Sequence, residues 1–231
     1  MKKNYENEDR LLEKNPLFSY LNIEEFRRVC AQKKYHLYHK NQVIFYEGTP
    51  AEIIYLLIEG KVKVHKHGIF GKEQIVRMAK DGDVLTYRAI GGVERYVVSA
   101  TAMEDSMVCC LSKEDLVSVL KDNGKFAYQV VMRLTEELDS AERVIRTLAQ
   151  KTVKQRVAET LITLREKYGE EADHELHIHL SRDELANLVG TATETVVRFL
   201  SDLKRKGIIE VSGQKIMILD LAKLERIASI A

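Results

Sequence analysis

Apolar and polar residues alternate in short segments through the first half of the chain, and each segment ends at glycine or acidic residues. Residues Ile53 to Glu59 end at Gly60, and lysine alternates with valine from Lys61 to Val64. Alternation with a period of two is typical of a β-strand with one buried face. The pattern predicts strands over residues 42–45, 53–59, 61–65, 73–78, 96–102 and 106–111. Many short strands at this spacing favour a sandwich or a rolled-up barrel.

Capping signals predict helices on both sides of these strands. Asn22, with glutamate three residues later, has the form of a helix start, and Ser112 to Asp115 resembles a capping box with aspartate in place of the usual Glu or Gln. Further along, residues 152–168 place apolar side chains on one face, and Gly169 ends that helix.

After Gly124 the hydrophobic period changes to alternating steps of four and three residues. This spacing is a heptad seam held for about three heptads, and it predicts a helix over residues 124–148. The narrow seam favours contact between two copies of the helix in a homodimer, while packing against the chain's own β domain is the alternative. The seam residues are Ala127, Val131, Leu134, Leu138, Ala141, Ile145 and Leu148.

The second half of the chain predicts two helices joined by a tight turn and followed by a hairpin. A capping box at Ser181 starts the first helix, Gly190 ends it, and a second capping box from Thr191 to Glu194 starts the next helix. Residues 174–180 alternate and are compatible with a short strand. The hairpin is expected to join residues 208–211 and 216–219 through a four-residue loop. Together these elements indicate a winged helix-turn-helix.

The outer face of the second helix carries polar side chains suited to DNA. Arginine can donate two hydrogen bonds to guanine, and glutamate can accept from cytosine. Threonines in the first turn can bond phosphate, as can the N–H groups exposed there. The alternative is a solvated helix whose Glu194 and Arg198 pair with each other. The candidate DNA-contacting residues are Thr191, Thr193, Glu194, Thr195, Val197, Arg198, Ser201, Lys204 and Arg205.

Charge supports nucleic-acid binding only locally. The chain has 36 Lys and Arg against 35 Asp and Glu, a net charge of +1, so there is no overall basic excess. Residues 143–168, however, contain seven basic and two acidic residues, and Lys204, Arg205 and Lys206 follow one another. Such clusters can neutralise phosphates, although basic residues at a helix C-terminus also complement the helix dipole.

The segment from Leu180 to Arg198 resembles the helix-turn-helix signature of the cyclic-AMP receptor/fumarate–nitrate regulator (CRP/FNR) family of bacterial transcription factors. The resemblance implies an α+β fold with a sensor β-roll at 1–123, a dimerisation helix at 124–148 and a winged helix-turn-helix at 149–231. It also implies double-stranded DNA and RNA polymerase as partners, with Glu194 and Arg198 reading bases. Thr193 stands where the family often has arginine.

The resemblance also implies a sensor pocket, but the nucleotide-binding cassette of the family is not met. Thr86 stands where the family has glycine, and Tyr87 replaces the glutamate that takes the ribose hydroxyl. Arg95 is out of register and has no serine after it. We therefore do not expect cyclic AMP to be the effector. Tyr87, Arg88 and Arg95 are candidates for binding another small molecule, whose identity stays open.

The cysteines and histidines do not form a recognised metal pattern. Three cysteines, Cys30, Cys109 and Cys110, are too few for an Fe–S cluster, and adjacent residues of a strand point to opposite faces. We expect these thiols to be buried and unreactive. The two His-x-His pairs, which begin at His65 and His177, lack further ligands and are expected at the surface. A haem-sensing or redox-sensing member of the family remains an alternative.

Other classes of protein find no support in the sequence. We expect no enzyme, because there is no nucleophile–histidine–acid set, metal trio or phosphate-binding loop. The N-terminus lacks the apolar core of a signal peptide, and no apolar run approaches the length of about 20 residues that a membrane helix needs. A cytoplasmic regulator is the expected class, and the winged helix-turn-helix argues against a nucleotide-binding module without a DNA role.

Overall fold

The computed structural model describes residues 12, 15–68, 71–172 and 174–229 of the chain. The chain divides into two compact units, residues 1–67 with 76–140 and residues 68–75 with 141–231. The first unit holds most of the strands, and the second is mainly helical with one small hairpin. The expected α+β class is confirmed, with a β domain, a long helix and a winged helix-turn-helix in that order.

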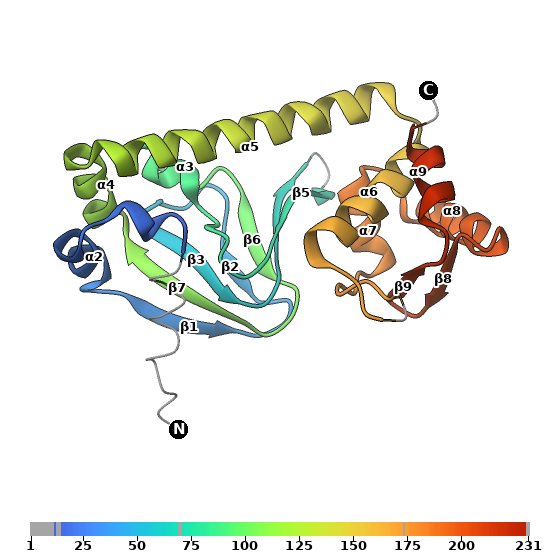
Figure 1. Ribbon diagram of the computed structural model, residues 1–231, viewed down its shortest axis with the longest axis horizontal. Helices are drawn as coiled ribbons and strands as arrows, with labels where there is room; N and C mark the ends of the chain where they lie inside the picture. The colour runs from blue at the N-terminus through green and yellow to red at the C-terminus, as the bar shows by residue number, and fades with distance from the viewer. Residues whose placement is uncertain (1–11, 13–14, 69–70, 173, 230–231) are drawn as a thin grey trace. The chain divides into compact units, whose positions relative to one another are not determined.

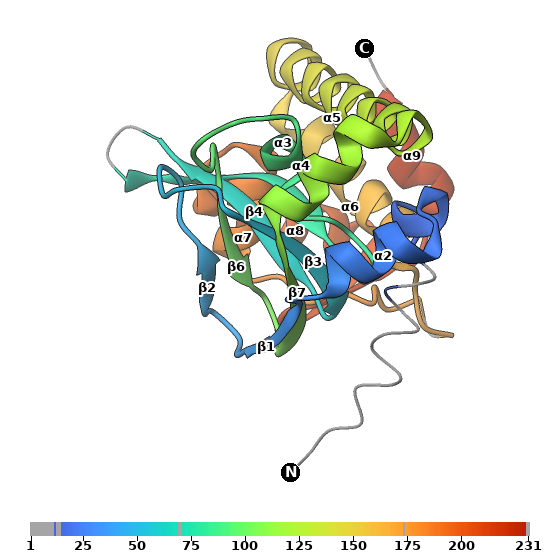
Figure 2. The same cartoon turned by 90° about the vertical axis from the view of Figure 1, so that its left-hand side faces the viewer.

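Two sheets make up the β domain, and strands close in sequence often lie in different sheets (Figures 1 and 2). Such an exchange between sheets produces the rolled arrangement that the sequence predicted. One sheet has the order β1–β7–β3, with bounds Lys34–Tyr38, Ser106–Ser112 and Ile53–Glu59. The other has the order β2–β6–β4–β5, with bounds Val43–Phe45, Ser99–Ala102, Val62–His67 and Glu73–Ala79.

Strand β1 was not expected from the sequence, and β6 is shorter than expected. β1 pairs with β7 along its whole length, yet most of its residues are exposed or half-buried, and Leu37 is 50% exposed. It lies at the end of its sheet, so the apolar alternation that marks the inner strands is weak here. β6 begins at Ser99 rather than at Tyr96.

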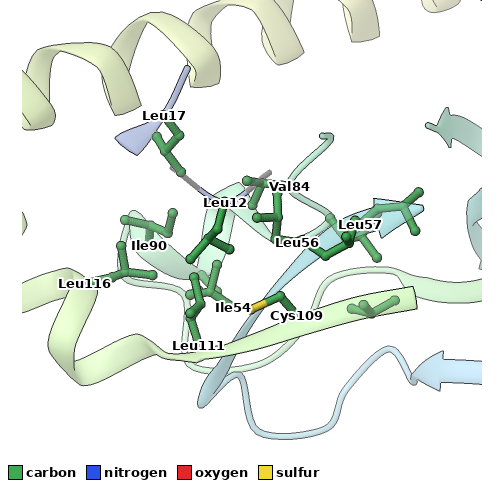
Figure 3. Close-up of a cluster of buried hydrophobic side chains, with 14 of the residues drawn as sticks. Leu12, Leu17, Ile54, Leu56, Leu57, Val84, Ile90, Cys109, Leu111 and Leu116 are labelled. Atoms are coloured by element: carbon green, nitrogen blue, oxygen red, sulfur yellow. The ribbon is translucent and has the colours of Figure 1, made fainter. Parts of the chain in front are cut away.

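The core of the β domain lies between the sheets and the helices that cover one end of them. Inward-facing side chains of β3 and β7 meet there, among them Ile54, Leu56 and Leu111, which are at most 1% exposed (Figure 3). Leu116 of α4 and Leu12 complete the same cluster. Each fully buried aliphatic side chain contributes about 1.5–3 kcal/mol to folding, so this cluster is the main source of the domain's stability.

One glycine of the β domain permits a close approach between strands. Gly60 follows β3 with a φ of 113°, and a Cβ there would lie 2.3 Å from the Oγ of Ser106. Its N–H donates to the carboxylate of Asp81 at 2.8 Å. Any larger side chain would therefore push β7 away and strain the backbone.

Short helices close the β domain, and their caps are those expected. Asn22 forms a full capping box with Glu25 at the start of α2 (Ile23–Cys30), and the side chain of Ser112 caps α4 (Lys113–Asp122). α2 and α4 pack against each other, as both views show. A 3-10 turn, η1 (Phe18–Tyr20), and the short helix α3 (Tyr87–Ile90) complete this unit.

The long helix α5 spans Gly124–Gln150, close to the expected residues 124–148. Near its start, Phe126 and Val130 are buried in the core of the β domain, and Leu134 packs against the same cluster. On another face, Val131, Leu138 and Ile145 are 56%, 59% and 66% exposed. These three follow one another at intervals of seven residues, so they form an uncovered apolar row along the helix.

The second unit contains four helices and a hairpin among the residues that the structure describes. Gly169 follows the last residue of α6, as predicted, and Thr152 forms a capping box at its start. α6 packs closely against α9 at the end of the chain. The helices are α6 (Val153–Tyr168), α7 (Arg182–Val189), α8 (Thr193–Arg205) and α9 (Leu221–Ser229), and the strands are β8 (Ile209–Ser212) and β9 (Lys215–Ile218).

Two predictions for this unit were wrong in detail. The hairpin loop has two residues rather than four, because Ser212 pairs with Lys215 and Gly213 supplies the positive φ, 58°, that a tight turn needs. Residues 174–180 do not form a regular strand. Isolated bridges at Glu175 and Leu176, and a hydrogen bond from the N–H of His177 to the carbonyl of Gly169, join this segment to its neighbours.

Candidate nucleic-acid interface and sensor pocket

The turn between α7 and α8 is built by the residues that the sequence singled out. The side chain of Ser181 accepts from the N–H of Glu184 in a full capping box. Gly190 ends α7 in the left-handed conformation, with a φ of 73°. The N–H groups of Gly190 and Thr191 both donate to the carbonyl of Ala186, which closes the turn and sets the direction of α8.

The second predicted capping box is wrong. α8 begins at Thr193, its N-cap is Ala192, and no side chain caps it. Thr191 lies one residue before the N-cap position, and its N–H closes the preceding turn. The hydroxyl of Thr193 instead donates to the carboxylate of Asp183 on α7 at 2.6 Å, which ties the two helices together. The first N–H groups of α8 therefore have no side-chain cap and remain suited to a phosphate.

The outer face of α8 is exposed, as its periodicity predicted. Val196, Leu200 and Leu203 are buried on the inner face. Thr191, Thr193 and Thr195 are half-buried beside the turn. The exposed residues on the outer face are Glu194, Val197, Arg198, Ser201, Lys204 and Arg205.

Arg198 is the arginine of α8 whose guanidinium is not committed to a carboxylate. Within the residues that the structure describes, it forms no ion pair, and its guanidinium lies over the ring of Phe199 at 5.5 Å. The ring limits the conformations of the guanidinium without using its N–H donors. Beside it, the apolar side chain of Val197 is 43% exposed and of the type that contacts a thymine methyl group.

The basic residues at the end of α8 are engaged with carboxylates. Lys204 bonds Glu210 and the carbonyl of Val211 on β8, so it braces the hairpin. Arg205 and Lys206 both bond Asp202, at 2.7 and 2.8 Å. Hydrogen bonds from Lys206 and then Arg205 lower the pKa of Asp202. A DNA phosphate would have to compete with these carboxylates for each cation.

Arg156 of α6 positions the turn, a role that sequence reasoning missed. Its guanidinium donates to the carbonyls of Val189 and Gly190 at 3.0 and 3.2 Å, and to that of Lys151 at 2.9 Å. Arginine satisfies carbonyls left over at the end of α7. Its place in a basic segment offered no signal to separate this role from phosphate binding.

Other cations of residues 143–168 also have internal partners. Arg165 makes two hydrogen bonds to Glu170, both of 2.7 Å, and Lys151 bonds Glu159 at 2.8 Å. The hydrogen bond from Arg165 lowers the pKa of Glu170 to about 2. The local basic excess is therefore smaller at the surface than the count of seven basic residues implied.

The seven seam residues of α5 divide into two sets. Val131, Leu138 and Ile145 are more than half exposed, and Leu148 is 44% exposed. Ala127, Leu134, Ala141 and Leu148 share the other heptad position, and the first three of these are half-buried. Leu134 approaches Gly91, where a Cβ would lie 3.4 Å from its Cδ1. Leu134 therefore faces the β domain, and the row of Val131, Leu138 and Ile145 is uncovered in the described chain.

Thr86 and Tyr87, the residues expected in place of the family glycine and glutamate, are both turned into the β domain. Thr86 is buried, and its hydroxyl accepts from the N–H of Tyr55 at 3.0 Å inside the roll. Tyr87 packs against the core cluster, and burial raises its pKa to about 12. The tyrosine therefore offers no anionic acceptor for a ribose hydroxyl, and its ring takes up apolar contacts instead.

Of the three effector-pocket candidates, Arg88 and Tyr87 lie near Glu137, and Arg95 contacts a different segment. Arg88 is 53% exposed in its side chain, and its Nε is 3.7 Å from the carboxylate of Glu137 on α5. Tyr87 lies near the same carboxylate, since the charge of Glu137 acts on the Tyr87 hydroxyl. Arg95 is elsewhere, with its guanidinium donating to the carbonyl of Gly48 at 2.7 Å.

The thiols are largely buried, and one histidine differs from expectation. Cys30 and Cys109 are buried and Cys110 is half-buried, and burial raises the pKa of the Cys109 thiol to about 12. His65 was expected at the surface but is 3% exposed, with its Nε2 2.9 Å from the Oγ1 of Thr101. His177 and His179 are exposed and pair with glutamates. Among the described residues, no group of three such ligands could hold a metal ion.

Comparison with known proteins gives matches to both halves of the chain. The model of the Crp-like helix-turn-helix domain matches residues 155–227, and that of the cyclic nucleotide-binding domain matches residues 35–123. The first match contains the turn, α8 and the hairpin, and the second contains both sheets and the segment from Thr86 to Arg95. No helix of the described part of the chain has the length and apolar character needed to cross a membrane.

Relatives match over most of their length. The anaerobic regulatory protein of Bacillus subtilis is 30% identical over 183 residues, which cover 78% of this chain and 77% of that protein. The cyclic AMP receptor protein of Thermus thermophilus is 27% identical over 215 residues, or 93% and 97% of the two chains. The solved structure of FixK2 from Bradyrhizobium japonicum has a TM-score of 0.78 at 26% identity, and the match covers 86% and 98% of the two chains.

Proposed function

This chain belongs to the CRP/FNR family of DNA-binding transcription regulators, which are not enzymes, and from that premise we propose that it binds a palindromic operator as a homodimer. α5 is the dimerisation helix in this proposal, and α8 is the recognition helix. Two-fold symmetry of the dimer would match two half-sites about one turn of DNA apart, roughly 34 Å. RNA polymerase is the further partner that the family implies.

The uncovered row on α5 supports the homodimer. Val131, Leu138 and Ile145 form an apolar stripe over two heptads, while the opposite row of the seam is half-buried. Exposed apolar side chains at a seven-residue repeat gain free energy when a second helix covers them. A second copy of the same stripe is self-complementary, as the interface of a two-fold dimer must be.

The exposed face of α8 supports base recognition and carries the proposal. In the described part of the chain, the guanidinium of Arg198 forms no ion pair with a carboxylate. The basic residues at the end of the helix, by contrast, are paired with carboxylates. Glu194, one turn earlier, adds an acceptor on the same face. One guanine contact by Arg198 and one cytosine contact by Glu194 would discriminate base pairs in the major groove.

Thr86 and Tyr87 support a sensor that does not bind cyclic AMP. Tyr87 is packed against the core in place of the expected carboxylate, and Thr86 fills the position of the glycine. Relatives include an anaerobic regulatory protein and a cyclic AMP receptor protein, so the family does not by itself name an effector. An effector of another chemical class fits these residues better.

A gel-shift assay tests the recognition face. An operator is first selected from genomic fragments, and binding is then compared with random DNA at several salt concentrations. Arg198→Ala should weaken operator binding by about ten- to a hundredfold, the loss of one bidentate guanine contact of about 1–3 kcal/mol, and should relax one G·C preference per half-site. Arg226→Ala, an exposed arginine on α9, serves as the matched control. If Arg198→Ala keeps the operator-to-random ratio of the control, α8 does not read bases through Arg198.

A further inference from the structure

Glu137 on α5 lies between two arginines of the β domain. Its Oε1 is 3.6 Å from the Nη2 of Arg77 on β5, and its Oε2 is 3.7 Å from the Nε of Arg88 on α3. The carboxylate is 21% exposed, so it is held in a half-buried corner between these elements. One acidic side chain of the long helix thus joins two separate parts of the sensor domain.

The two arginines differ in how firmly their guanidinium groups are held beside a possible anion. The guanidinium of Arg77 is fixed, because it donates to the carbonyls of Val84 and Leu85 just before α3. The guanidinium of Arg88 makes no hydrogen bond among the described residues, so its donors are available on a half-exposed side chain. The planar fork of a guanidinium matches carboxylate and phosphate oxygens, so two guanidiniums close together can bind such an anion.

The carboxylate of Glu137 forms no close hydrogen bond with the guanidinium of Arg77 or Arg88. Its ion-pair distances are close to 4 Å, whereas Arg133 contacts Glu136 at 2.8 Å and Arg165 contacts Glu170 at 2.7 Å twice. Charge-assisted hydrogen bonds have lengths of about 2.7–2.9 Å, so the bonds between Glu137 and its two arginines are not formed. A separate oxyanion, which is not tethered to a helix, could approach both guanidiniums more closely.

The charges around the corner show that such an anion must replace Glu137. The charges of Arg77, Arg133, Asp83 and Glu137 act on the hydroxyl of Tyr87, Glu136 pairs with Arg133, and Glu137 faces Arg88, so three cations lie among three carboxylates. With Glu137 in place there is no excess positive charge to attract a second anion. When Glu137 moves away, the two guanidiniums are left without a carboxylate, and a compact oxyanion restores the balance.

We propose that a small oxyanion, a phosphate or carboxylate group of an effector, binds between Arg77 and Arg88 by displacing Glu137. Tyr87 lies beside the site and offers a hydroxyl donor and an apolar ring to the rest of such an effector. Glu137 directly precedes Leu138, which is 59% exposed on the uncovered stripe of α5. Displacement would therefore act on the helix of the proposed dimer. This regulatory consequence rests on the proposed function, whereas binding of the anion does not.

Calorimetry with inorganic phosphate and with succinate, at constant ionic strength set by chloride, tests the site on the full chain. Glu137→Gln should bind at least one of the two about three- to tenfold more tightly than the unmodified chain, because two competing ion pairs of the usual exposed strength are removed. Glu136→Gln, the neighbouring carboxylate that pairs with Arg133, is the matched control and should bind like the unmodified chain. Arg88→Gln should bind at least about threefold more weakly.

Equal affinity of the Glu137→Gln and Glu136→Gln variants, or no binding of either probe by Glu137→Gln, would overturn the proposal. Circular dichroism verifies folding, and if Glu137→Gln does not fold, unchanged binding by Arg88→Gln overturns it equally. Preference for phosphate over succinate assigns the oxyanion class. DNA binding is measured separately by gel shift. Anion binding without operator binding would refute the proposed function alone, and operator binding with unchanged anion affinity in Glu137→Gln would refute this site alone.

Discussion

Replacement of Leu138 by lysine tests the interface on α5 at its centre. Leu138 lies between Val131 and Ile145 on the uncovered stripe, one heptad from each, and is 59% exposed. Burial of a whole leucine side chain contributes about 1.5–3 kcal/mol, and somewhat more than half of this one remains to be covered, so each copy would gain about 1–1.5 kcal/mol in a dimer.

Both protomers contribute the residue, so Leu138→Lys should cost the dimer about 2–3 kcal/mol from lost burial alone. The dissociation constant should therefore rise by about thirty- to 150-fold, and the two facing lysines would add repulsion. Sedimentation equilibrium over a wide range of protein concentrations measures this constant directly. The variant should fold normally, because the side chain is not part of the core of the β domain.

Met132→Lys is the matched control for this experiment. Met132 is 40% exposed on the same helix, but it lies about 120° around the helix from Leu138, away from the stripe. The control should leave the dissociation constant close to that of the unmodified chain. If both variants have the same dissociation constant, or if Leu138→Lys has no effect, the uncovered stripe is not the dimer interface.

Three further predictions concern the turn, pH and the sensor. Arg156→Ala should lower the free energy of unfolding by about 2–3 kcal/mol, because a charged donor leaves the carbonyls at the end of α7, and urea denaturation with the exposed Arg146→Ala as control measures this loss. The depressed pKa of Glu170 stabilises the fold above its ordinary value of 4.5, so stability should fall as pH drops from there towards 2, and Glu170→Gln should flatten that decline in unfolding curves. Calorimetry should show no micromolar binding of cyclic AMP, because Tyr87 replaces the ribose-binding carboxylate; such binding would contradict the proposed sensor.

The N-terminal part of the chain shows which features of the sensor sequence alone could predict. The alternation of apolar residues identified β3, β4, β5 and β7 within one or two residues, because their side chains are sorted between core and surface. β1 was missed, since it lies at the end of its sheet and pairs through its backbone, which leaves no strong pattern in its side chains. The corner around Glu137 was also out of reach, because Arg77 and Glu137 are sixty residues apart.

By itself the sequence determined the local features of the DNA-binding unit. The capping box at Ser181, the left-handed Gly190 and the inner face of α8 depend on neighbours within a few residues, so spacing alone revealed them. Only the tertiary structure decided which groups the basic side chains and the helix-capping candidates bind. Thr193 bonds Asp183 on α7 while α8 has no side-chain cap, and Arg156 binds carbonyls at the end of α7. The acceptor that each hydrogen-bond donor binds depends on which groups folding brings near it from distant positions in the chain. The order of residues along the chain does not indicate these partners.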